Sequence, residues 1–251
     1  MAKIIAIANH KGGVAKTTSC VNIAAALAKM GRRVLLVDVD PQANLTSSFT
    51  DESKIEASIY DAMKGAPVPI MHIMENLDLI PSHIDLAGAD MVFSNKIARE
   101  QILKIILDEL KENYDYIIID TPPALGLVTI NALTAADSVI ISICAETLPL
   151  RGLVMLDEMI GDIAQSINKG LHVSGIIIAK YNRRKLDNAV IDAIRAKYGD
   201  KIFKTYIRTG VAAAEAPTYR QSVLDYAPNS TVAEDYRALA KEIDEEQYKD
   251  K

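Results

Sequence analysis

The 251-residue sequence has no tryptophan, only three phenylalanines and only two cysteines. Two cysteines cannot build a disulfide framework, so we interpret Cys20 and Cys144 as small buried hydrophobic residues. Because large aromatic side chains are scarce, Ile, Leu, Val and Ala must build the core from the 49% of residues that are hydrophobic. No apolar run reaches the length of a membrane-spanning helix, which argues against an integral membrane protein.

The sequence also lacks an overall excess of positive charge. Its net charge of −5 argues against a general attraction to nucleic acids. The basic residues are unevenly distributed, however: residues 180–208 contain nine basic and three acidic side chains, a local charge of +6 against −11 for the rest. This asymmetry is typical of a localised phosphate-binding surface, although a solvated helix face would give the same pattern.

Short apolar runs alternate with longer amphipathic stretches along the whole chain. This alternation predicts an α/β fold, a doubly wound and mostly parallel sheet with helices on both faces. No internal repeat or linker interrupts it, so we expect a single domain over residues 1–251. The expected strands are residues 3–9, 33–39, 77–80, 115–119, 138–143, 173–179 and 202–206.

A glycine-bearing segment follows the first apolar run and leads into a helix. Such a strand–loop–helix unit cradles phosphate, because backbone N–H groups and the helix dipole converge on the anion. Lys16 would reach the β- and γ-phosphates, and the Thr17 hydroxyl would bind Mg²⁺. The predicted phosphate loop comprises Lys11, Gly12, Gly13, Val14, Ala15, Lys16, Thr17 and Thr18.

The loop departs from the strict pattern of Gly, four residues and Gly-Lys-Ser/Thr. His10 and Ala15 occupy its two glycine positions. Alanine tolerates most backbone conformations but adopts the left-handed one only at a cost. We therefore expect a negative φ at Ala15.

Carboxylates follow two further apolar runs. Residues 33–37 lead into Asp38 and Asp40, and residues 116–119 lead into Asp120. The carboxyl ends of parallel strands share one edge of the sheet, which is where ligands bind. We expect Asp40 to orient a water molecule or hold the metal's water shell, Asp120 to hold Mg²⁺, and Asp38 to be buried behind them.

Together, these segments resemble the deviant Walker-type ATPases of the ParA/MinD group, and most closely the ParA-type partition ATPases. The likeness spans nearly the whole chain. The matching segments are Lys11–Thr18, Asp38–Gln42, Asp120–Pro123, Ala214–Pro217 and the closing run 233–242.

The resemblance implies a Mg²⁺-dependent ATPase whose two copies sandwich ATP. Lys11 would reach the partner's phosphates, as an arginine finger does, and Lys16 and Asp40 would complete the catalytic set. Asn182 and Pro217 are candidates for the adenine contacts. The metal ligands implied are Thr17, Asp40 and Asp120.

The resemblance also implies sequence-independent DNA binding by the ATP-bound dimer. Our candidates for the contacts are Arg183, Arg184, Lys204 and Arg208, because they flank the ends of expected elements. A ParB-like protein or another cargo adaptor would stimulate hydrolysis, and the cargo would be a plasmid, a chromosome or a protein assembly. The protein would be cytoplasmic, and associated with the nucleoid when ATP is bound.

Two alternatives use the same fold. A small-molecule ATP-dependent ligase or kinase would need a substrate pocket facing the γ-phosphate. A MinD-like membrane-positioning ATPase would need a basic amphipathic C-terminal helix, whereas residues 231–251 are net acidic. We instead expect Val232, Tyr236, Leu239 and Ile243 to dock this helix on the protein.

Overall fold

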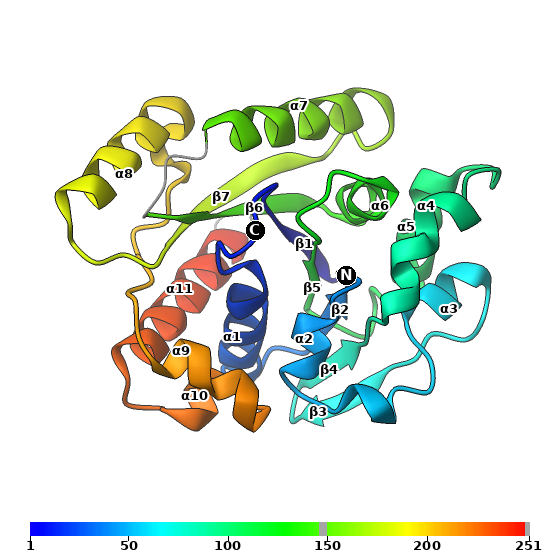
Figure 1. Cartoon of the computed structure of the whole chain (residues 1–251), viewed down its shortest axis with the longest axis horizontal. Helices are drawn as coiled ribbons and strands as arrows, with labels where there is room; N and C mark the ends of the chain where they lie inside the picture. Colours follow the sequence, from blue (N-terminus) through cyan, green and yellow to red (C-terminus); the bar gives the residue numbers. More distant parts are fainter. Residues whose placement is uncertain (146–149, 249–251) are drawn as a thin grey trace.

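The computed structural model describes residues 1–145 and 150–248, which include a seven-stranded sheet (Figure 1). The strand order is β3-β4-β2-β5-β1-β6-β7, and every neighbouring pair is parallel except β3 and β4. The α/β prediction is confirmed. The strands are β1 Lys3–Ala8, β2 Val34–Asp38, β3 Met71–Met74, β4 Leu77–Ile80, β5 Tyr116–Asp120, β6 Ser138–Cys144 and β7 His172–Ala179.

The central strands form because they are apolar at nearly every position. All residues of β2 and β5 are buried, as expected for parallel strands covered on both faces. Their register pairs Asp38 with Asp120, and β1 on the other side of β5 pairs Ile7 with Asp120. The two carboxylates and the end of β1 therefore meet at one edge of the sheet.

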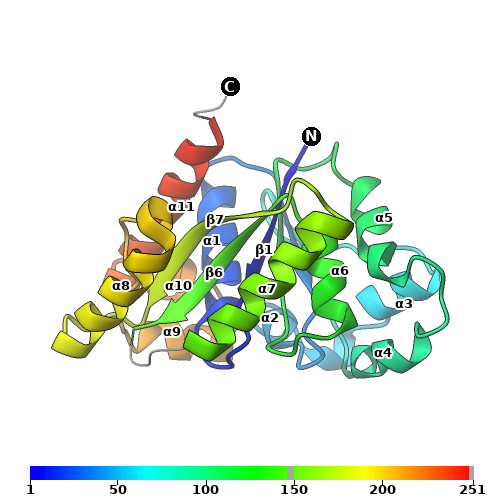
Figure 2. The same cartoon turned by 90° about the horizontal axis from the view of Figure 1, so that it is seen from above.

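Helices cover both faces of the sheet (Figures 1 and 2). One face packs against α1 (Lys16–Lys29) and α11 (Thr231–Tyr248), and the other against α5 (Ile102–Asp108), α6 (Leu127–Ala135) and α7 (Leu150–Ser166). The remaining α-helices are α2 Asn44–Ser47, α3 Ile59–Lys64, α4 Ala89–Val92, α8 Lys185–Tyr198, α9 Ala212–Glu215 and α10 Val223–Tyr226.

Helix α11 docks on the body of the protein as predicted. Val232, Tyr236, Leu239 and Ile243 are all buried, in the same apolar cluster as α1. The Tyr236 hydroxyl lies 3.2 Å from Ser19 Oγ on α1. No helix in the described ranges is both long and apolar enough to cross a bilayer.

Two strand predictions differ from the structure. Residues 202–206 do not form a strand: Ile202 makes an isolated bridge to Ile176, and the Phe203 ring packs over Gly175, where a Cβ would lie 2.3 Å from it. Their apolar character reflects packing onto β7. The unexpected strand is β3, which pairs antiparallel with β4 across a turn whose Asn76 has φ 63°.

Both cysteines are buried, as predicted. Cys20 lies on α1, inside the apolar cluster between that helix and the sheet, and Cys144 ends β6.

Candidate functional site

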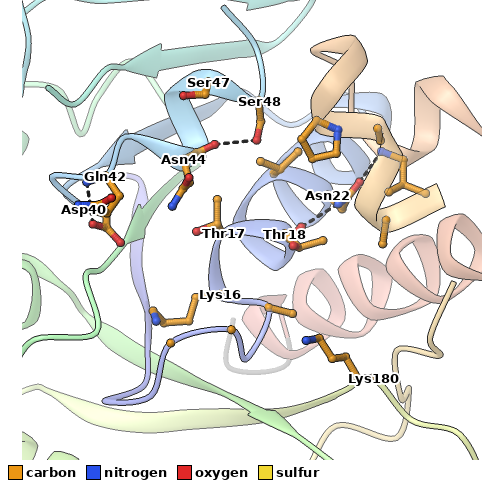
Figure 3. Close-up of a pocket in the computed structure, with 18 of the residues that line it drawn as sticks. Lys16, Thr17, Thr18, Asn22, Asp40, Gln42, Asn44, Ser47, Ser48 and Lys180 are labelled. Atoms are coloured by element: carbon orange, nitrogen blue, oxygen red, sulfur yellow. Dashed lines mark hydrogen bonds between the residues drawn. The ribbon is translucent and has the colours of Figure 1, made fainter. Parts of the chain in front are cut away.

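A cavity of about 540 Å³ opens at the carboxyl edge of the sheet, where the phosphate loop, β2 and β7 end (Figure 3). Lys16 and Lys180 extend into it from different elements, and Asp40 and Gln42 lie together at one end. The predicted residues that line it are Gly12, Gly13, Ala15, Lys16, Thr17, Thr18, Asp40 and Pro217.

The phosphate loop is tied to the neighbouring strand β6 by buried hydrogen bonds. The Asn9 side chain donates to Ser142 O at 2.7 Å and accepts from Lys11 N at 3.0 Å. Ser142 Oγ donates in turn to Val14 O at 2.6 Å, and Val14 is buried beneath the loop. These hydrogen bonds fix the loop against β6.

Lys16, the first residue of α1, is a buried cation. Only 7% of the Lys16 surface is exposed, and Lys16 Nζ donates to Lys11 O at 3.3 Å. Burial lowers the pKa of Lys16, while the charges of Asp120 and Asp40 oppose that shift. An anion entering the cavity would stabilise this ammonium group, as the γ-phosphate of a nucleotide does in phosphate loops.

The expectation of a negative φ at Ala15 is wrong. Ala15 has φ 64° and ψ 28°, the left-handed conformation, and Gly13 has φ 74°. The tight turn before the first residue of α1 requires this geometry whatever residue occupies the position. Alanine adopts it at a cost of about 1–2 kcal/mol.

We expect Ala15→Gly to stabilise the nucleotide-free protein by about 1 kcal/mol, because glycine adopts a positive φ without strain. The melting temperature should rise by about 2–4 °C in thermal unfolding. Ala164→Gly, inside α7, is the control and should lower the melting temperature instead. A lower melting temperature for Ala15→Gly would contradict the strain.

Thr17 and Asp120 form a candidate metal site at the start of α1. Thr17 Oγ1 donates to Asp120 Oδ2 at 2.6 Å, and Asp120 Oδ1 is buried with no hydrogen-bond partner among the described residues. Burial, followed by the charge of Asp38, raises the pKa of Asp120. An unpaired buried carboxylate oxygen beside a hydroxyl suits Mg²⁺ and its water shell.

Asp38 anchors the segment that carries Asp40. It is fully buried and accepts from Asp40 N at 3.1 Å, Thr46 N at 2.9 Å and Thr46 Oγ1 at 2.7 Å. Thr46 Oγ1 also accepts from Ser82 N at 3.0 Å, beyond the end of β4. Burial raises the pKa of Asp38 to about 6, against the hydrogen bonds from Thr46. Both ends of the segment are thus fixed, and Asp40 itself accepts from Gln42 N.

Thr46→Val should destabilise the protein by about 1–3 kcal/mol, because it keeps the side-chain shape but removes the hydroxyl that donates to Asp38 and leaves Ser82 N without its acceptor. Unfolding in urea measures the loss. Thr46→Ser retains the hydroxyl and should cost less, so equal losses from the two variants would contradict a role for this hydrogen bond.

Three residues that were predicted to bind the nucleotide do not line the cavity. Val14 is buried, and the Lys11 side chain is exposed. Asn182 does not line the cavity: its N donates to Asp187 Oδ2 and its Nδ2 to Lys180 O. The lining residue from this turn is Lys180, which the rule that ligands bind at strand ends could have identified.

The four basic residues predicted to contact DNA differ in exposure and in ion pairing. Arg183, Arg184 and Lys204 are exposed. Arg208, by contrast, donates from Nη2 to Asp235 at 2.7 Å, and its Nε also contacts that carboxylate at 2.9 Å. This ion pair occupies Nε and Nη2 of Arg208, and the contact of Arg208 with phosphate stays a prediction.

Comparison with known proteins agrees with the site. A family model described as an AAA domain matches residues 2–173. The sporulation initiation inhibitor protein Soj of Bacillus subtilis is 44% identical and aligns over 97% of this chain and 98% of its own. The chromosome-partitioning ATPase Soj of Thermus thermophilus is 37% identical over 95% and 94% of the two chains.

A solved structure has the same fold throughout. Cobyrinic acid a,c-diamide synthase from Mycobacterium smegmatis, with bound ADP and magnesium, is 35% identical, with a TM-score of 0.85 over 96% of this chain and 93% of its own. The phosphate loop, the strand-end carboxylates and these near full-length likenesses agree: the chain belongs to the ParA/Soj group of deviant Walker-type P-loop ATPases.

Proposed function

We propose that this protein is an ATP-driven switch whose ATP-bound dimer binds DNA without sequence preference and positions a cargo. The observation that carries the proposal is the joint placement of Lys16, Thr17, Asp120 and Asp40 at one edge of the sheet. Each of these groups would have a role in phosphoryl transfer, and the loop that leads into Lys16 and Thr17 is hydrogen-bonded to β6.

Different residues of the site would bind the phosphates, hold Mg²⁺ and orient the attacking water. The loop N–H groups and Lys16 would bind the β- and γ-phosphates, and Thr17 and Asp120 would hold Mg²⁺ through its water shell. Mg²⁺, when bound, neutralises charge on the phosphates. Asp40, fixed by Gln42 N and anchored through Asp38, would orient the attacking water.

We propose that Lys11 acts outside its own subunit. Its backbone is fixed by Asn9 and its carbonyl accepts from Lys16, while its side chain is exposed. In a dimer that sandwiches ATP, such a side chain can reach the partner's phosphates and stabilise the transition-state charge. ATP would then close the dimer, and hydrolysis would open it.

The basic turn before α8 supports the DNA part of the proposal. Arg183 and Arg184 lie together at this turn, and Lys204 is also exposed. Dimerisation would double this surface. Contacts of this kind with phosphate give sequence-independent and strongly salt-dependent affinity.

The double variant Arg183→Glu and Arg184→Glu should weaken DNA binding by the ATP-bound protein at least about tenfold and leave ATP hydrolysis unchanged. Filter binding of duplex DNA and phosphate release measure the two effects. Lys64→Glu with Lys169→Glu makes the same charge change on exposed side chains elsewhere and serves as a control. Unchanged DNA affinity in the Arg183 and Arg184 variant would exclude this surface.

The name of one relative supports a role in positioning a cargo. The Thermus relative is named as a chromosome-partitioning ATPase. For this chain we propose a ParB-like or other adaptor protein that accelerates hydrolysis, and a cytoplasmic location that becomes nucleoid-associated in the ATP-bound state.

A small-molecule ligase is the second candidate, favoured by the likeness to the Mycobacterium smegmatis synthase. The ligase hypothesis gives no role to the exposed Lys11 or to residues 180–208, whose local charge is +6. ATP turnover by the purified protein that requires a carboxylic acid acceptor, without DNA binding, would favour the ligase.

A further inference from the structure

A hollow of about 510 Å³ lies at the amino edge of the sheet, at the opposite end of the strands from the phosphate cavity. Its lining includes the first residues of three strands, Lys3 of β1, Ser138 of β6 and His172 of β7. Lys201, in the turn after α8, and Glu246, near the end of α11, also line it. Figure 2 shows the start of β1 and the last turns of α11 on the same side of the molecule. We call this site the amino-edge hollow.

The floor of the amino-edge hollow is apolar. Ile5, Ile140 and Ile243 line it, and all three are buried in the apolar cluster between the sheet and α11. Phe203 also lines it, and the Phe203 ring packs over Gly175 of β7. Because small-molecule sites combine an apolar lining with a few polar groups, this floor suits the apolar body of a small ligand.

The two lysines of the hollow are not paired with acids. Lys3 is half-buried and Lys201 is exposed, and neither side chain has an ion pair or a hydrogen bond among the described residues. Glu246 is the one acidic side chain in the described lining, and His172 Nδ1 donates to Gly170 O at 2.9 Å. With His172 neutral, two lysines and one glutamate give a local charge of +1. This charge matches a carboxylate better than a phosphate monoester, which carries about −1.5 to −2 at pH 7.

Ser138 adds a hydroxyl group whose hydrogen-bonding capacity is unused. The residue is fully buried, and Ser138 Oγ has no hydrogen-bond partner in the described part of the chain. The neighbouring serine of the hollow differs, because Ser174 Oγ donates to Val139 O at 3.3 Å. A buried hydroxyl without a partner is unfavourable, and a carboxylate oxygen in the hollow would accept its proton.

We propose that the amino-edge hollow binds a small carboxylic acid with an apolar body. The carboxylate contacts Lys3 and Lys201 and accepts a hydrogen bond from Ser138 Oγ. The apolar body lies on Phe203 and Ile243. The proposal is independent of the proposed ATPase function, because the hollow shares no lining residue with the phosphate cavity.

Titration of the full-length, ¹⁵N-labelled protein with hexanoate, followed through the amide chemical shifts, tests the binding without nucleotide. Hexanoate should shift the amides of Ser138, His172 and Val173 until the site is saturated. Hexanamide has the same apolar body without the charge and should bind at least about tenfold more weakly. Absence of saturable shifts at these amides would overturn the proposal, and tighter binding of hexyl phosphate would overturn the assignment to a carboxylate.

The double variant Lys3→Met and Lys201→Met should weaken hexanoate binding about tenfold or more, because both cationic contacts are lost. The matched control is Lys54→Met with Lys64→Met, the same change on two exposed lysines before and at the end of α3. It should alter the affinity less than about twofold. Equal weakening by the two double variants would mean that net charge, rather than the hollow, holds hexanoate, and would overturn the proposal.

Ser138→Ala keeps the test independent of charge. The variant should weaken hexanoate binding about threefold or more, because the carboxylate loses one hydrogen bond. Its melting temperature without ligand should not fall, since Ser138 Oγ has no partner to lose among the described residues. Unchanged affinity, or a lower melting temperature, would overturn the assignment of this hydroxyl to the ligand.

Discussion

Lys16→Ala is expected to raise the dissociation constant for ATP by about a hundredfold or more, since it removes a buried charge from the centre of the phosphate cavity. The ammonium group is fixed on Lys11 O and lies in the field of Asp120 and Asp40. Nothing in the described cavity replaces it beside the phosphate loop, because Lys180 extends from the end of β7 (Figure 3).

Isothermal titration calorimetry with ATP and Mg²⁺ measures this effect. Lys29→Ala, at the far end of the same helix and paired with Asp225 on the surface, is the matched control and should bind ATP normally. Circular dichroism checks that both variants fold. Undiminished nucleotide affinity in Lys16→Ala would refute the assignment of the phosphate loop.

Asp40→Ala is expected to retain ATP binding and to lose hydrolysis by about 10²–10⁴-fold, the range for removing a group that assists proton transfer. Asp40 lines the cavity, with Oδ1 held by Gln42 N. Asp40 makes no hydrogen bond to the phosphate loop among the described residues, so ATP binding should survive. The variant would accumulate as an ATP-bound dimer.

Phosphate release and size-exclusion chromatography with ATP separate the two effects. Asp85→Ala, an exposed carboxylate paired with His83 near the end of β4, is the control and should behave as wild type. Rapid hydrolysis by Asp40→Ala would remove Asp40 from the mechanism. A monomeric variant that still fails to hydrolyse would contradict the trapped dimer.

Much of the fold could be predicted because the central strands are uninterrupted apolar runs. Strand β3 could not, since it is a four-residue strand at the sheet edge in which no residue is fully buried and burial does not alternate. Residues 202–206 were wrongly predicted to form a strand because they are apolar. Phe203 is apolar because its ring fills the space over Gly175, and not because it pairs with a neighbouring strand.

The phosphate loop could be predicted, because the spacing of residues within one continuous segment is enough to bring its hydrogen-bond donors together. Contributions from distant elements were predicted only in part: Asp40 and Pro217 line the cavity as expected, and Lys180 lies at a strand end where ligands bind. Gln221 reaches the cavity through the placement of the turn before α10, which no local pattern specifies. The backbone of Ala15 was mispredicted because the turn, rather than the preference of alanine, determines its φ.

The measurement that tests the central claim most directly is binding of random-sequence duplex DNA with ATP·Mg²⁺, with ADP and without nucleotide, each at two salt concentrations. We predict tight binding with ATP alone, weakening steeply as salt rises. Binding that is absent in every state, or equal in all three, would contradict a nucleotide-controlled DNA switch.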